Sequence, residues 1–154
     1  MGEVVLARDQ QLDRDVAIKR LRSANPSPAT VQRFLREAKI QARLDHPSIV
    51  PVHQLGSDAS GQPYFVMKRL SGTTLAAHIR KVTKSPQELL RAFVDVCLAI
   101  DFAHQRGVIH RDLKPENVML GEYGEVYVID WGSRASSTNP MSRACPASPP
   151  HPIR

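Results

Sequence analysis

The sequence has little that would send the protein into a membrane or out of the cell. None of its apolar runs is long enough to cross a bilayer, and the N-terminus lacks the charged and then apolar pattern of a secretory signal. There are only two cysteines: Cys97 lies in an apolar helical pattern and Cys145 in a proline-rich stretch. We interpret them as free thiols in a reducing compartment, which predicts a cytoplasmic protein without a membrane segment.

Patterns typical of metal centres and nucleic-acid binding are also absent. The six histidines show no metal-ligand spacing. The formal net charge is +6, but residues 133–154 hold three arginines and no acid, so they supply +3 of it. The remaining charge forms no basic stripe and is not interleaved with aromatic residues. We therefore do not expect nucleic acid to be a partner.

The 154 residues, 42% of them hydrophobic, suffice for one compact domain or two small lobes. Several segments have the β-branched and apolar content of strands. These are residues 3–8, 15–21, 49–55, 64–70, 118–120 and 125–129.

Helix start signals are also clear. Ser27 followed by Pro28 predicts a helix running to about residue 44. Ser85 with Glu88 three residues later is a capping box, and it predicts a second long helix over residues 86–105. A shorter helix is expected over residues 74–82.

Composition divides the chain into three parts. A strand-rich part covers residues 1–70, and a helix-rich part covers residues 71–132. Residues 133–154 contain five of the twelve prolines and five serines, without apolar periodicity. Such a stretch buries too little surface to offset its ordering entropy, so we expect it to be disordered.

One compact segment carries groups suited to phosphate and metal chemistry. Asp112 offers a carboxylate, Lys114 a cation and Asn117 a neutral oxygen. Asp130 follows thirteen residues after Asn117, and two short strands with a tight turn between them would bring the two side by side. Oxygen ligands of this kind suit Mg²⁺ shared with phosphate oxygens.

These residues resemble the signature of the protein kinase family. HRDLKPEN at residues 110–117 is similar to the catalytic loop, DWG at 130–132 to the family's DFG, and VAIK at 16–19 to its third-strand motif. Lys114 matches the serine/threonine type, and the style of residues 44–56 and 64–67 resembles bacterial members. The resemblance implies an α+β fold with an antiparallel-sheet N-lobe that lacks its first strand, followed by a partial helical C-lobe.

The resemblance also implies ATP and Mg²⁺ as cofactors, a protein as substrate, and a role for each matched residue. Asp112 would accept the substrate hydroxyl's proton, Lys114 would neutralise the γ-phosphate, and Lys19 would hold the α- and β-phosphates while paired with Glu37. The magnesium ligands would be Asn117 and Asp130. The adenine pocket would comprise Val4, Ala17, Lys19, Met67, Lys68, Leu70 and Met119, with hinge backbone groups coming from Lys68 and Leu70.

Plainer interpretations stay open for several of these residues. Lys19 alone would be taken as a surface lysine, and Glu37 as a solvated helix residue. Met67 and Met119 are also ordinary core residues. Trp131 is expected to pack in the core, and His110 to be structural.

Two stretches of the family pattern are missing. Of the phosphate-covering motif G-x-G-x-x-G-x-V, only Gly2 and Val4 have counterparts, so Met1 is a candidate misassigned internal start. After residue 132 no activation segment or substrate-binding helices can be recognised. We therefore expect a kinase domain truncated at both ends. The alternative to an active kinase is a non-catalytic nucleotide-binding or interaction fragment.

The helix expected over residues 86–105 is apolar nearly all round, as in a helix buried on every side. Burying one Leu or Phe contributes roughly 1.5–3 kcal/mol. Leaving several exposed would create an adhesive patch. We expect low solubility, self-association or dependence on a partner through this helix.

Overall fold

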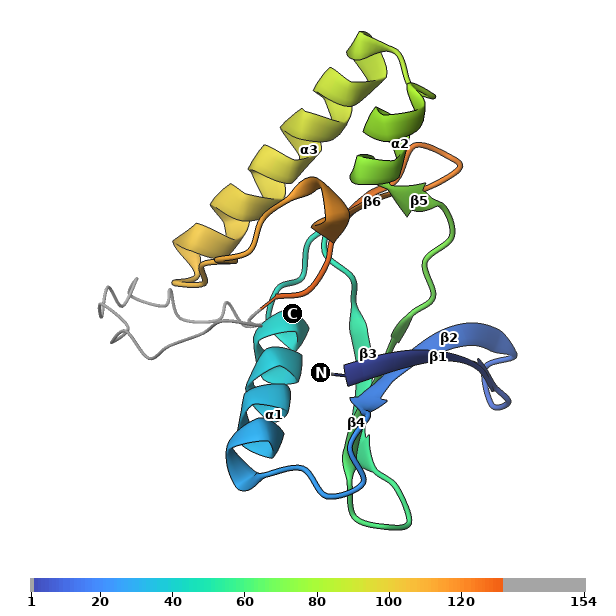
Figure 1. Cartoon of the computed structure of the whole chain (residues 1–154), viewed down its shortest axis with the longest axis vertical. Helices are drawn as coiled ribbons and strands as arrows, with labels where there is room; N and C mark the ends of the chain where they lie inside the picture. Colours follow the sequence, from blue (N-terminus) through green and yellow to red (C-terminus); the bar gives the residue numbers. More distant parts are fainter. Residues whose placement is uncertain (1, 132–154) are drawn as a thin grey trace, which may run out of the picture.

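Two antiparallel sheets and three α-helices make up residues 2–131, the part of the chain that the computed structural model describes (Figure 1). The first sheet has the order β1-β2-β4-β3 and the second the order β5-β6-β7. The first sheet comprises β1 (Gly2–Asp9), β2 (Arg14–Leu21), β4 (Pro63–Lys68) and β3 (Val52–Ser57). The second comprises β5 (Thr73–Thr74), β6 (Val118–Leu120) and β7 (Val126–Val128).

Helix α1 (Pro28–Ala42) packs beside the first sheet. Its N-cap is Ser27, whose side chain accepts a hydrogen bond from the backbone of Thr30, as the start signal predicts. Phe34 of α1 contacts Phe65 of β4, with ring centroids 5.3 Å apart. Together with Leu21 and Ala38 they form the first of two small cores.

Helix α3 (Pro86–Gln105) packs against β7 in the second core. Its capping box forms as predicted, between Ser85 and Glu88. The face turned to the sheet is built largely of small residues, and Ala99 and Ala103 are fully buried. Two shorter helical elements complete this half: α2 (Leu75–Lys81) and the 3₁₀ turn η1 (Pro115–Asn117).

The segment between α1 and β3 crosses from the first half of the structure to the second. Leu44 and Ile49 belong to the second core, and Ile49 forms an isolated parallel bridge with Val128. The backbone N–H of Val128 also donates to the carbonyl of Ser48 at 2.8 Å. One stretch of the N-terminal 70 residues is therefore attached to the sheet that carries the C-terminal strands.

The predicted fold class is confirmed, and most element bounds agree with the structure to within about two residues. The strand predicted over residues 49–55 starts later, at Val52. The reason is that Pro51 has no N–H for a ladder and Ile49 is paired with β7 instead. The two-residue β5 and the turn η1 were not predicted. Disorder was expected for residues 133–154, which lie outside the described range. Gly132 also lies outside it.

The connection from β4 to β5 requires a glycine. Gly72 has φ +112°, and a Cβ added there would lie 2.1 Å from the carbonyl oxygen of Leu120. The chain therefore passes directly against the edge of β6, and only a residue without a side chain fits.

The outer face of α3 is uncovered by the described residues. Leu90, Phe93 and Leu98 are between 55% and 64% exposed, at helical spacing along one side. Figure 1 shows α3 at the margin of the structure. Within residues 2–131, no helix combines the length and the apolar character that crossing a membrane requires.

Candidate active site

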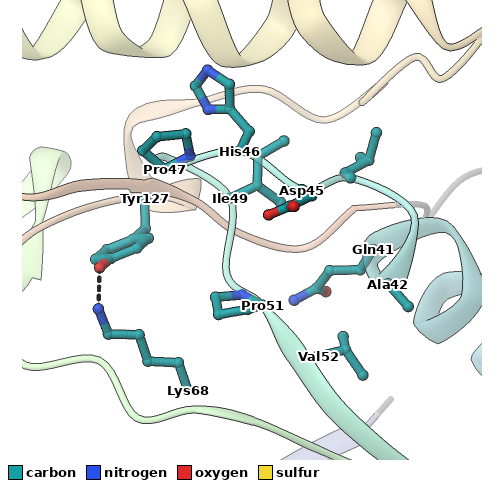
Figure 2. A pocket seen from close by; sticks show the side chains of 11 residues that line it. Gln41, Ala42, Asp45, His46, Pro47, Ile49, Pro51, Val52, Lys68 and Tyr127 are labelled. Atoms are coloured by element: carbon teal, nitrogen blue, oxygen red, sulfur yellow. Dashed lines mark hydrogen bonds between the residues drawn. The ribbon is translucent and has the colours of Figure 1, made fainter. Parts of the chain in front are cut away.

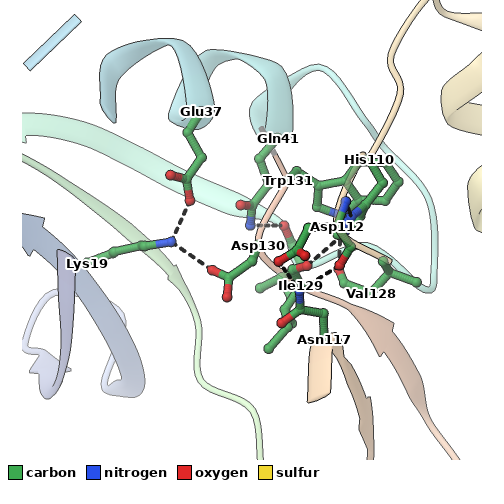
Figure 3. Close-up of polar contacts among 11 residues, drawn as sticks. Lys19, Glu37, Gln41, His110, Asp112, Asn117, Val128, Ile129, Asp130 and Trp131 are labelled. Carbon is green, nitrogen blue, oxygen red and sulfur yellow. Dashed lines mark hydrogen bonds and ion pairs between the residues drawn. The ribbon is translucent and has the colours of Figure 1, made fainter. Parts of the chain in front are cut away.

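One lysine joins three elements at the centre of the structure. Lys19 lies in the middle of β2, between Val4 of β1 and Phe65 of β4. Its Nζ forms ion pairs with Glu37 of α1 and with Asp130, just after β7, the latter at 3.0 Å (Figure 3). The Lys19 and Glu37 side chains are 15% and 11% exposed, whereas Asp130 is 48% exposed. Glu37 is thus a buried partner and not a solvated helix residue.

Lys19, Glu37 and Asp130 form a trio of one ammonium and two carboxylates. Its composition determines how these groups ionise. Burial lowers the pKa of Lys19, but the charges of Glu37 and Asp130 and their hydrogen bonds outweigh it, so the pKa is raised overall. Burial raises the pKa of Glu37, and the attraction of Lys19 only partly offsets this while Asp130 adds to it. The two carboxylates therefore account for the raised pKa of Lys19, whereas burial is the largest cause of the raised pKa of Glu37. When all three side chains are ionised the cluster has a net charge of −1, which a further cation at Asp130 would offset.

The segment before β6 carries two of the predicted catalytic residues, Asp112 and Lys114, and the predicted metal ligand Asn117. The Lys114 ammonium lies 2.9 Å from Oδ2 of Asp112. Buried Asn117 donates through Nδ2 to the backbone carbonyl of Asp112 at 2.8 Å and to its Oδ2 at 3.2 Å. Because the amide nitrogen is engaged by Asp112, the amide oxygen is the atom left for a ligand.

Strand pairing brings this loop next to Asp130. Strands β6 and β7 are antiparallel, with Val118 opposite Val128, so the residues flanking the pair meet at one end. The backbone N–H of Ile129 donates to the carbonyl of Asn117 at 3.0 Å. This is the arrangement that the spacing of Asn117 and Asp130 predicts.

His110 supports the loop from within. Its Nδ1 lies 3.3 Å from the backbone N–H of Asp112, which donates to it, so Nε2 carries the proton and donates to the carbonyl of Ile129 at 2.8 Å. The ring of Trp131 meets the His110 ring edge-on at 4.8 Å, and its Nε1–H donates to the carbonyl of Val128 at 2.9 Å. These contacts agree with the structural role expected for His110. They also agree with the core position expected for Trp131.

Two of the four non-glycine residues with positive φ in the described part of the chain belong to this site. Arg111 and Asp130 have φ of +65° and +61°, in the left-handed region that non-glycine residues seldom adopt. Each such residue costs on the order of 1–3 kcal/mol unless its surroundings fix it. No motif spacing signals this feature.

A cavity of about 280 Å³ opens beside Lys19. It brings together all seven residues predicted for the adenine pocket. The lining is Val4, Leu6, Ala17, Lys19, Gln41, Val50, Met67, Lys68, Leu70, Met119, Ile129 and Asp130. The backbone N–H of Lys68 donates to the carbonyl of Pro51 at 3.2 Å, so the group that Lys68 can offer a ligand is its carbonyl.

A larger cavity, about 520 Å³, shares Gln41 and Lys68 with this one (Figure 2). Lys68 points into it, with its ammonium bonded to the hydroxyl of Tyr127 at 2.5 Å and 4.9 Å from the centre of the Tyr127 ring. Despite its larger size, this second cavity is not the better candidate for a nucleotide site. It contains none of the residues 19, 112, 117 and 130, and its lysine is already paired.

Gln41 is a functional candidate that sequence reasoning missed. It is buried and lines both cavities, as does Lys68. The available signal was positional: Gln41 lies one turn after Glu37, on the face of α1 that Phe34 and Ala38 mark as buried.

The donors at this site fit Mg²⁺ bound together with phosphate. Among residues 2–131 there is no group of three or more His, Cys, Asp or Glu side chains that could hold a metal ion. Asn117 and Asp130 are two adjacent oxygen donors. Magnesium is commonly bound by one or two carboxylates plus waters and phosphate oxygens, so this incomplete set suits it.

The structure has two lobes, and its lysine is held between a helix carboxylate and the aspartate of a DxG motif. This combination defines the protein kinase class. The protein kinase domain family matches residues 1–147. The chain therefore belongs to the protein kinase family.

Bacterial serine/threonine-protein kinases are among its relatives. The chain is 41% identical over 146 residues to serine/threonine-protein kinase PknD of Protochlamydia amoebophila and 42% identical to PknD of Chlamydia trachomatis serovar D. Each match covers 86% of this chain but only 15% and 16% of the relatives. The chain also resembles the M. tuberculosis PknI kinase domain, with 34% identity and a TM-score of 0.69 over 86% of this chain and 53% of that one.

Proposed function

We propose that this chain carries the site for ATP- and Mg²⁺-dependent phosphoryl transfer to a serine or threonine hydroxyl of a protein. The observation that carries the proposal is Lys19, held by Glu37 and Asp130 at the mouth of an apolar cavity. Phosphoryl transfer asks the protein mainly for positioning and charge stabilisation, which is what such an arrangement supplies. The names of the bacterial relatives support the same reading.

The residues of the cavity divide into an apolar wall and a charged rim. The adenine ring would lie between Val4 and Ala17 above and Met119 below, with its edge against the backbone of Lys68 and Leu70 and with Met67 at the back. A phosphate chain leaving the cavity would meet the Lys19 ammonium first. Asn117 and Asp130 would hold Mg²⁺, which when bound neutralises phosphate charge.

Asp112 and Lys114 would act on the transferred group. The Asp112 carboxylate would accept a hydrogen bond from the substrate hydroxyl and finally its proton. Asn117 fixes the orientation of Asp112 through its two hydrogen bonds. Lys114, 2.9 Å from Asp112, would hold the γ-phosphate and keep negative charge at the carboxylate compensated.

The test combines nucleotide binding with transfer of label. The chain is incubated with γ-labelled ATP, Mg²⁺ and a mixture of serine- and threonine-containing peptides, alongside Lys19→Met and Asp112→Asn. Lys39→Met makes the same chemical change at an exposed position of α1 and is the matched control. We expect acid-stable label on serine or threonine with the wild type and Lys39→Met only. Failure of the wild type to bind ATP would refute the proposal.

A second candidate, a nucleotide-binding or interaction module without turnover, is favoured by one observation. Side chains of α3 expose a continuous apolar stripe in the described part of the chain, as interaction surfaces do. Saturable ATP binding that needs Lys19, without any transfer of label, would support this function over the first.

A further inference from the structure

Gln41 presents a buried side-chain amide next to the charged trio. It is 4% exposed, and its Nε2 donates to the backbone carbonyl of Val50 at 2.9 Å. A buried amide is costly unless it is hydrogen-bonded, so an apolar residue would have been the simpler filler here. The bond to Val50 is what the amide provides at this position.

That hydrogen bond links α1 to the segment before β3, which is itself attached to β7. Val50 follows Ser48 and Ile49, and both are attached to Val128 of β7, one through its carbonyl and the other through a parallel bridge. Asp130 comes two residues after Val128. The amide of Gln41 therefore connects the C-terminal part of α1 to the backbone that carries the second carboxylate of the trio.

The trio needs such a connection because its two carboxylates belong to different elements. Glu37 approaches Lys19 from α1, one turn before Gln41, and Asp130 approaches from the end of β7. Figure 3 shows Glu37 and Gln41 on the same side of α1, above Asp130. Rotation or sliding of α1 would move Glu37 away from Lys19 while leaving Asp130 in place.

We propose that Gln41 is a positioning residue: its hydrogen bond to Val50 fixes α1 relative to β7, so that Glu37 and Asp130 reach Lys19 together. The inference rests on the proposed function, since the trio is assigned there to the phosphates of ATP. Gln41 also lines the nucleotide cavity, and one of the two N–H groups of its amide is engaged by Val50.

The experiment compares a ligand that needs the trio with one that does not. Affinities for ATP with Mg²⁺ and for adenosine are measured for the wild type, Lys19→Met, Gln41→Met and the control Gln32→Met. Gln41→Met keeps the size of the side chain and removes the donor. Gln32→Met makes the same change at an exposed position of α1. Adenosine has no phosphates, so its binding reports on the cavity alone.

For Gln41→Met we expect the preference for ATP over adenosine to fall by about tenfold, as when a supporting hydrogen bond behind a ligand-binding group is removed. Adenosine affinity and the behaviour of Gln32→Met should be unchanged. A second readout is the rate at which an acyl phosphate of ATP acylates Lys19, which depends on where its ammonium is held and needs no phosphoryl transfer. This rate should fall in Gln41→Met as well.

The outcomes separate this inference from the function on which it rests. A wild type that does not prefer ATP over adenosine refutes the proposed function itself. If the wild type prefers ATP and Lys19→Met does not, but Gln41→Met equals the wild type, the positioning role is refuted alone. An equal loss of ATP and adenosine affinity in Gln41→Met also refutes it, because that pattern indicates damage to the cavity. Should Gln41→Met fail to fold, Gln41→Leu, which also lacks the donor and adds no charge, undergoes the same comparison.

Discussion

Replacing Lys19 by methionine should destabilise the fold as well as abolish nucleotide chemistry. The substitution keeps the side-chain length and removes the ammonium, which leaves Glu37 buried without its cation. Breaking a buried ion pair by removing one partner costs about 3–5 kcal/mol. Asp130 is half exposed and adds little, since exposed pairs contribute about 0–1 kcal/mol. We therefore expect a loss of about 3 kcal/mol in the free energy of unfolding at about pH 8.

The loss should depend on pH with a definite sign. Burial already raises the pKa of Glu37 above its ordinary value of 4.5 while Lys19 is present, and removing Lys19 removes the attraction that lowers it. A carboxyl with a raised pKa in the folded state binds a proton where the unfolded chain has lost it. The contribution of this carboxyl to the free energy of unfolding is therefore largest below about pH 4.5 and falls as the pH rises through the folded-state pKa. The deficit of Lys19→Met should thus be small in acid and full at about pH 8.

Urea unfolding followed by fluorescence measures this directly. Trp131 is the single tryptophan, is fully buried and follows Asp130 immediately, so its emission reports on the site. Lys39→Met is again the matched control. The double variant Lys19→Met/Glu37→Gln removes the buried charge and should be more stable than Lys19→Met at about pH 8, by about 1–3 kcal/mol. A deficit that does not change with pH, or a double variant no more stable than the single one, would refute the reasoning.

Three further predictions concern other parts of the structure. The hydrogen bond from the backbone N–H of Ser85, with further hydrogen bonds, lowers the pKa of Glu88 from 4.5 to about 2. The ionised Glu88 therefore contributes to stability above about pH 4.5, and this contribution is lost as the pH falls toward 2. The urea midpoints of the wild type and Glu88→Gln should converge over that interval. Gly72→Ala should cost on the order of 1–3 kcal/mol for the backbone alone, and more from the contact with Leu120, in urea unfolding. Phe93→Gln, on the exposed face of α3, should reduce light scattering without lowering the urea midpoint.

Each of these has an internal control. Gly61→Ala also has a positive φ, +80°, but its new Cβ meets nothing within 4 Å, so it should cost less than Gly72→Ala. Equal losses would contradict the close approach to β6. Glu122→Gln makes the same chemical change as Glu88→Gln at an exposed position outside the capping box. Phe34→Gln, buried in the first core, should lower the midpoint where Phe93→Gln does not.

The sequence predicted which residues form the site better than it predicted the contacts that hold those residues in place. Motif spacing alone brought Asn117 and Asp130 together, because two paired strands leave no other place for the residues that flank them. The resemblance to kinases named seven of the residues that line the cavity, and these lie on four strands and a connection. The pairing of Glu37 with Lys19 depends on the rotation of α1 about its axis, which helical periodicity indicates only approximately. The resemblance to kinases supplied that choice.

What could not be predicted are contacts that depend on packing between distant segments. The bond from Gln41 to Val50 joins two positions with no shared motif, and the bridge of Ile49 to Val128 crosses from one half of the chain to the other. The left-handed backbone at Asp130 is likewise set by its surroundings and not by residue type. Such features follow from tertiary structure, so local patterns carry no signal for them.

Association through the exposed face of α3 does not require any change in the nucleotide site, because the two depend on opposite faces of the helix. Helix α3 contributes to the second core through Ala92, Val96, Ala99 and Ala103, and this core holds β7 and therefore Asp130. The apolar stripe of Leu90, Phe93 and Leu98 points the other way and touches no residue of the trio. Small side chains on the inner face let α3 approach the sheet closely, whereas the large ones outside are those that we expect to promote association. Poor solubility of the chain would therefore not by itself argue against an assembled nucleotide site.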